Sequence, residues 1–253
     1  MQHLSTFRLA LWLPAAVVAC TVWGGECQAQ ALRGGELEIK ALATGEERTA
    51  QSDLYVMDVV YKPMRMIQVE LTDPATGEKK LEYVWYIVYR TFNRKLVRPS
   101  SDTPPQNIVD PEVISPALFV PEFTLQTTDT PAPETYQDQI IPEAIAVINK
   151  REKGKYRSTV DIVGPIPPTT DYGDTDREGL WGVAMWRGVD PEADRYTVFL
   201  TGFSNGIRTT EGPDGQPVIQ TKTIVQKYWR PGDEFEQAEP EIRPDGVSQW
   251  IYR

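Results

Sequence analysis

Short runs of β-branched and aromatic residues, separated by loops rich in glycine, proline and aspartate, fill most of the chain after residue 53. This pattern is typical of an antiparallel β-sandwich or open barrel. We therefore expect a mainly β fold with one packed helix. The predicted strands lie at 55–61, 66–71, 81–92, 156–163, 179–187, 196–203, 218–229 and 247–252.

The run Leu81–Phe92 is apolar on both faces of a pleated strand, which is typical of a central strand that is covered on both sides. Asp73-Pro74 and Thr76-Gly77 provide turn residues between this run and 66–71. The two runs are therefore predicted to form a hairpin with a long loop.

A helix is predicted over 142–153. Pro142 suits its first turn, and Ile141, Ala144, Ile145 and Ile148 fall on one face at helical spacing. Basic residues near its end complement the helix dipole, and Gly154 stops it. We expect the helix to lie against the sheet.

Nine prolines fall between Pro99 and Pro142, and only 117–125 resembles a strand there. Because proline cannot donate a hydrogen bond to a ladder, 98–137 is predicted to be an ordered crossover that runs along an edge or over the surface.

The N-terminus has the features of an export signal. Residues 9–23 form an apolar run that is too short to span a membrane comfortably, and Ala29-Gln30-Ala31 offers a cleavage site after Ala31. The segment Val17–Cys20 is a loose lipoprotein box, so lipidation at Cys20 is the alternative. We predict a signal peptide over 1–31, a flexible leader over 32–52 and a single domain over 53–253.

The composition and net charge of the chain argue against several classes of function. The net charge of −10 argues against nucleic-acid binding, which needs a basic footprint. Both cysteines, Cys20 and Cys27, and the only histidine, His3, precede the predicted cut. The mature chain would therefore lack histidine-dependent catalysis, cysteine catalysis and Cys/His zinc sites.

The segment Gly202–Gly206 fits the G-x-S-x-G pattern of a nucleophile elbow. An elbow needs a following helix and a histidine base, and the residues after Gly206 do not favour a helix. Asn205-Gly206 between two apolar runs instead predicts a hairpin turn.

Two acidic features remain open. Asp174, Asp176 and Glu178 resemble the opening of a calcium loop, although position twelve of that loop is Met185 instead of glutamate. No cofactor is expected unless calcium binds there. The carboxylates Glu122, Asp161 and Glu178 could serve glycoside hydrolysis, but their spacing in sequence assigns no catalytic role.

Aromatic residues on the predicted strands could form a sugar-stacking platform or could pack in the core. Trp186 beside Arg187, at the end of its run, is the pair that we expect to be exposed for ligand binding. Two basic clusters could together hold an acidic polymer or anionic lipid if they are adjacent. They are Arg90, Arg94, Lys95 and Arg98, and Lys150, Arg151, Lys153, Lys155 and Arg157.

The runs 84–90, 119–123 and 182–191 resemble segments of uncharacterised secreted or envelope proteins of planctomycete-type bacteria. The resemblance implies an envelope or extracellular setting and no activity. The leading hypothesis is an exported, non-enzymatic binding or structural component of the bacterial cell envelope, whose partner is a polysaccharide or another envelope protein. Its location would be periplasmic or extracellular, or lipid-anchored at a membrane face. The alternatives are a carboxylate-dependent carbohydrate-active enzyme and a calcium-stabilised adhesion module.

Overall fold

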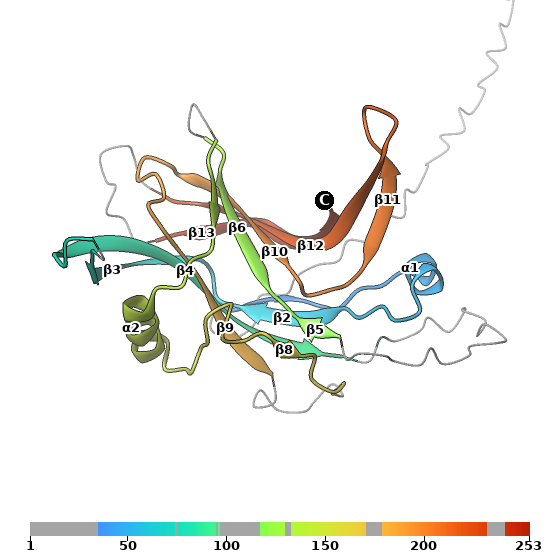
Figure 1. Ribbon diagram of the computed structural model, residues 1–253, viewed down its shortest axis with the longest axis horizontal. Helices are drawn as coiled ribbons and strands as arrows, with labels where there is room; N and C mark the ends of the chain where they lie inside the picture. The colour runs from blue at the N-terminus through green and yellow to red at the C-terminus, as the bar shows by residue number, and fades with distance from the viewer. Residues whose placement is uncertain are drawn as a thin grey trace, which may run out of the picture.

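The computed structural model describes residues 35–73, 75–94, 96, 117–129, 133–170, 179–231 and 241–253. These residues form a mainly β, sandwich-like fold with 52% strand and 10% helix, in three antiparallel sheets (Figure 1). The predicted mainly β fold class is therefore confirmed, and the described sheets are sandwich-like and form no closed barrel.

The first sheet is organised around β4 (Lys79–Asn93). One edge of β4 pairs with β2 (Met57–Tyr61) and with β3 (Arg65–Thr72), and the other edge pairs with β9 (Leu180–Arg187). A short β1 (Leu37–Ile39) pairs with β2. The predicted 66–71 and 81–92 hairpin is confirmed, and β4 is central as its two-faced apolar pattern indicates.

The second sheet is organised around β12 (Pro217–Trp229). It pairs with β10 (Arg195–Thr201), β11 (Ile207–Glu211) and β13 (Arg243–Tyr252). The order continues from β10 to β6 (Glu122–Thr127) and then to β7 (Thr135–Gln137). A separate two-stranded sheet joins β5 (Leu118–Phe119) and β8 (Gly164–Pro165).

Successive side chains of β4 and β9 point to opposite faces of the sheet, so the buried residues form two clusters, one on each face. Trp85, Tyr89 and Trp186 point between the sheets and pack against residues of the second sheet such as Phe123 and Leu200. The opposite faces carry a second buried cluster, which the helix α2 (Pro142–Glu152) covers with Ile141, Ala144 and Ile148. The predicted helix is confirmed, and it ends one residue before the predicted boundary.

Residues 32–52 were expected to be a flexible leader, and this prediction is wrong for 37–50. Ile39 of β1 is buried in the core. The helix α1 (Gly45–Ala50) begins with a complete capping box, in which Thr44 and Glu47 satisfy each other's backbone N–H groups. Local capping and a pairing strand, rather than a hydrophobic run, order this segment.

Two strand predictions also need correction. Residues 156–163, expected to be a strand, form turns apart from a single bridge between Arg157 and Gly182. The crossover expected along an edge or surface instead contributes β6, which is paired on both sides, with β10 and β7. The side chains of Phe123 and Leu125 on β6 are fully buried. Burial of these apolar side chains favours an internal position of β6 in the sheet.

The hairpin predicted at Asn205-Gly206 is wrong, because β10 and β11 both pair with β12 and not with each other. Segment 202–206 docks onto the chain before β2. Ser204 Oγ donates to the carbonyl of Tyr55 (2.8 Å), and Asn205 Oδ1 accepts from the N–H of Tyr55 (2.8 Å). The hairpin turn lies instead at 212–216, where Gly215 has a φ of +76°.

Candidate functional site

The structure separates the predicted ligand pair Trp186 and Arg187. Trp186 is 0% exposed and packs between the sheets, so its predicted exposure is wrong. Successive residues of a strand point to opposite faces, so Arg187 is exposed on the side of the sheet that carries α2. Trp181 shares that side with Arg187, six residues earlier on β9, and it is only half-buried.

A pocket of about 560 Å³ lies beside the C-terminal end of α2. It combines three cationic side chains with one indole ring. Its lining residues are Lys153, Gly154, Lys155, Arg157, Gly179 and Trp181. The pocket therefore gathers most of the second basic cluster around an aromatic face, and we call it the basic-aromatic pocket.

Local chain geometry explains this gathering. Lys153 ends α2 in the left-handed region (φ 55°, ψ 40°), and the N–H of Gly154 donates to the carbonyl of Asn149. A Cβ on Gly154 would lie 2.3 Å from the Tyr156 ring, so only glycine fits this turn. The chain then runs alongside β9, because the N–H of Arg157 donates to the carbonyl of Trp181 (3.1 Å).

The dipole of α2 explains only part of the positive charge of the second basic cluster. Lys150 and Arg151 lie in the last turn of α2, where cations stabilise the helix. Lys155 and Arg157 lie beyond the end of the helix, and both side chains are exposed. Within the described ranges, no carboxylate forms an ion pair with Lys153, Lys155 or Arg157.

The first basic cluster is arranged differently. Arg90 Nη2 lies 2.7 Å from Glu36 Oε2, and Arg94 Nε lies 3.5 Å from Asp58 Oδ2. Lys95 and Arg98 lie outside the described residues. The first cluster reaches the basic-aromatic pocket through Arg90, whose guanidinium lies 5.2 Å from the centre of the Trp181 ring. Arg90 and the tilted Tyr156 ring (5.4 Å between centres) thereby position the indole.

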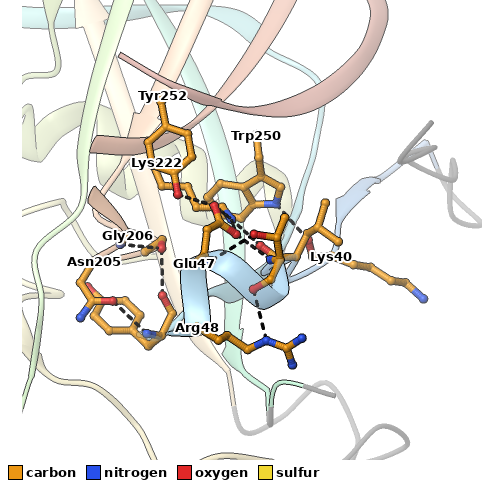
Figure 2. A network of polar contacts seen from close by, with 12 residues as sticks. Lys40, Glu47, Arg48, Asn205, Gly206, Lys222, Trp250 and Tyr252 are labelled. Atoms are coloured by element: carbon orange, nitrogen blue, oxygen red, sulfur yellow. Dashed lines mark hydrogen bonds and ion pairs between the residues drawn. The ribbon is translucent and has the colours of Figure 1, made fainter. Parts of the chain in front are cut away.

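A polar network elsewhere in the molecule ties the N-terminal segment to the second sheet. The Lys222 ammonium donates to both carboxylate oxygens of Glu47 (2.8 and 2.9 Å) and to the carbonyl of Leu42 (2.5 Å). The hydroxyl of Tyr252 also donates to Glu47, and the indole of Trp250 donates to the carbonyl of Lys40 (Figure 2).

The electrostatics of this network favour a structural role. Burial raises the pKa of Glu47, but hydrogen bonds from Lys222 and Tyr252 outweigh it and leave that pKa below its usual value. Lys222 is 3% exposed, and its three N–H donors are all satisfied. An ammonium held in this way has no lone pair for nucleophilic or base chemistry.

Among the described carboxyls, burial raises the pKa of Asp58 and of Asp138 above the ordinary aspartate value. Asp58 contacts Arg94 and the N–H of Ala41, whereas Asp138 contacts Thr159 and Phe123. The two carboxyls share no hydrogen-bond or ion-pair partner among the described residues.

The other candidate acids are exposed or lie outside the described part. Glu122 is exposed at the start of β6, and Asp161 is exposed and accepts a hydrogen bond from Ser158 (2.6 Å). Asp174, Asp176 and Glu178, with Cys20 and the predicted signal, lie outside the described residues. Within 35–73, 75–94 and the later described ranges, no cluster of three or more acidic, histidine or cysteine side chains could hold a metal.

No protein-family model, curated protein or solved structure matches this chain. In the described part, neither helix is long and apolar enough to cross a bilayer.

Proposed function

We propose that this protein is an exported, non-enzymatic component of the bacterial cell envelope that binds an acidic polysaccharide in the basic-aromatic pocket. One observation carries the proposal: Lys153, Lys155 and Arg157 surround Trp181 without a carboxylate partner in the described ranges. The apolar indole face would pack against a sugar ring, while the cations bind its carboxylate, sulfate or phosphate groups.

The positive charge of this pocket contrasts with the net negative charge of the chain. The chain carries a net charge of −10, so a nonspecific polyanion is repelled by most of the molecule. Binding would therefore concentrate where several unpaired cations are close together. Because the cations are exposed, salt screens them, and affinity should fall as ionic strength rises.

The binding test uses calorimetric titration with an oligogalacturonide as the anionic probe and a neutral glucan oligosaccharide of equal length as the comparison. Two of the three pocket cations, Lys155 and Arg157, each have a matched exposed cation on α2 that does not line the pocket. The pairs are Lys155→Gln against Lys150→Gln, and Arg157→Gln against Arg151→Gln.

Loss of one charge-assisted hydrogen bond costs about 1.5–3 kcal/mol, so each pocket substitution should weaken binding about tenfold or more. The helix controls should stay within about twofold. Equal binding of the neutral glucan, or equal losses in the pocket variants and their controls, would overturn the proposal.

Export belongs to the same proposal and has its own test. Mass spectrometry of the protein from its native envelope fraction should show an N-terminus at Leu32, which follows the predicted cut after Ala31. A diacylated N-terminus at Cys20 would place the protein on a membrane face instead. An intact N-terminus in the cytoplasmic fraction would contradict export.

A further inference from the structure

A β-hairpin stands away from the body of the molecule at one end of the second sheet, and we call its residues, 207–221, the arm (Figure 1). Within the described ranges, Pro217–Gln220 pair with β11 alone, because β13 and Arg253 reach β12 only from Thr221 onward. Every residue of the arm is exposed or half-buried. A two-stranded hairpin without a core beneath it is only marginally stable in water, so contact with a second surface would stabilise the arm.

The tip of the arm is a rigid, acidic turn. The N–H of Gly212 donates to the carbonyl of Gln216 (2.8 Å), and the N–H of Gln216 donates to Asp214 Oδ1 (3.2 Å). Pro213 fixes its own φ within this turn. Glu211 and Asp214 are exposed, and no described cation forms an ion pair with either. The tip therefore presents a proline ring between two unpaired carboxylates.

One face of the arm combines this charge with apolar surface. Thr209 pairs with Ile219, and Glu211 follows two residues along the strand, so Glu211 and Ile219 share a face. Ile219 is 66% exposed. The only cation of the arm, Arg208, lies on the opposite face, where its guanidinium is 4.2 Å from the centre of the Tyr252 ring. The tip and the face with Ile219 therefore carry negative charge only.

The basic-aromatic pocket has the complementary properties. Three exposed cations surround the indole of Trp181, and no acidic residue lines the pocket in the described part of the chain. The acids that neighbour it already have partners, so the pocket keeps a positive charge. Glu152 binds Lys62 and Arg65, Glu36 binds Arg90, and Asp161 accepts a hydrogen bond from Ser158.

An apolar rim adjoins the pocket. Val160 is 61% exposed and Val163 is 44% exposed. Between them, the carbonyl of Asp161 accepts a hydrogen bond from Arg157 Nη1 (3.4 Å), so the turn that carries both valines lies beside a pocket cation. This rim gives the exposed Ile219 of the arm an apolar surface to pack against when the tip occupies the pocket.

The arm and the pocket lie on opposite sides of one molecule. The pocket adjoins α2, which covers the outer face of the first sheet, whereas the arm extends from the second sheet and points away from α2 (Figure 1). The tip therefore does not reach the pocket of its own chain. A contact between two different patches is heterologous, so it builds rings or open chains of molecules.

We propose that the tip of the arm of one copy of this protein docks in the basic-aromatic pocket of a second copy, so that molecules assemble head to tail. Glu211 and Asp214 bind the pocket cations, and Pro213 packs against the indole of Trp181. Because the tip is already rigid, docking costs little conformational freedom. Acidic polysaccharide would then compete with the tip for one pocket, a regulation that rests on the proposed function.

The test measures the mass of the purified protein by sedimentation as its concentration rises. The unaltered protein should form species larger than dimers, and about 1 M salt, with a Debye length of about 3 Å, should return it to monomers. Glu211→Gln with Asp214→Asn keeps the turn but removes both charges, and should raise the dissociation constant about tenfold or more. Glu46→Gln with Glu192→Gln, which removes two exposed acids elsewhere, should not.

A mixture of two variants distinguishes head-to-tail docking from other contacts. Lys155→Gln with Arg157→Gln removes pocket cations and keeps the tip, whereas the tip variant keeps the pocket. Each should be monomeric alone, and an equimolar mixture should form a dimer with one copy of each and nothing larger. Lys150→Gln with Arg151→Gln should assemble like the unaltered protein. Circular dichroism checks each fold, and if the pocket variant fails to fold, the tip variant and its control still decide the question.

A monomer at every concentration, association unaffected by the tip variant, or no dimer in the mixture of folded variants would overturn the inference. Oligogalacturonide should convert the assembly to monomers as it binds. Oligogalacturonide that binds and leaves the assembly intact would also overturn the inference. Head-to-tail assembly without any binding of oligogalacturonide would contradict the polysaccharide proposal alone.

Discussion

The ammonium of Lys222 and the carboxylate of Glu47 form an ion pair at 2.8 Å, with 4% and 14% of their side chains exposed. The pair joins β12 to α1 across 175 residues of sequence. Together with Tyr252 and Leu42, it fixes the N-terminal segment onto the second sheet. The segment 37–50 is therefore an integral part of the domain.

Breaking this pair should destabilise the fold. Glu47→Gln leaves the buried Lys222 ammonium without a counter-charge, which costs about 3–5 kcal/mol for a buried pair. Glu46→Gln, an exposed neighbour in the same helical turn, should change the free energy of unfolding by less than about 0.5 kcal/mol. Urea denaturation of both variants measures the difference. Equal losses would show that the helical turn, rather than the ion pair, matters.

The same pair predicts a dependence on pH. The pKa of Glu47 is lower in the folded protein than its ordinary value of 4.5, so its contribution to stability is present above that value. It should be lost as pH falls from 4.5 through the lowered folded value. Denaturation midpoints measured from pH 6 to pH 3 should fall less steeply in Glu47→Gln than in the unaltered protein. Parallel pH profiles would contradict this assignment.

Gly202 should tolerate no side chain. Its φ is +89°, and a Cβ would lie 2.1 Å from the carbonyl oxygen of Val120. Gly246 has a similar φ of +76° but open space around it. Gly246→Ala should therefore cost about 1–2 kcal/mol from backbone strain alone, and Gly202→Ala should cost clearly more. Thermal denaturation compares the two, and similar losses would show that the contact with Val120 yields easily.

Trp186 and Arg187 should behave oppositely despite being adjacent. Trp186→Ala removes a fully buried indole from between the sheets and should cost about 3–5 kcal/mol. Arg187→Ala removes an exposed side chain and should stay within about 0.5–1 kcal/mol. Chemical denaturation of both variants provides the measurement. A small loss in Trp186→Ala would be inconsistent with its place in the core.

The basic-aromatic pocket was only partly predictable. Both basic clusters are visible in the sequence, but the contact between Arg90 and Trp181 depends on strand register, because the two residues are direct partners across β4 and β9. Lys155 and Arg157 alternate with Tyr156 beyond the end of the helix, and this local pattern could have indicated an exposed cationic pair around a buried ring, which the structure shows. Among the strand aromatics the sequence favoured Trp186 as the exposed one, whereas the structure buries Trp186 and places Trp181 in the pocket.

The sequence by itself determined the elements that local physics controls. Two-residue alternation and turn residues specified most strands, and Pro142, Gly154 and the apolar spacing specified α2. Only the tertiary structure decided which strands pair, which face of β9 is buried, and how 37–50 and 202–206 are held. Those outcomes depend on contacts between residues far apart in the chain, such as Lys222 with Glu47 and Asn205 with Tyr55, and a pattern read along the chain carries no information about such contacts.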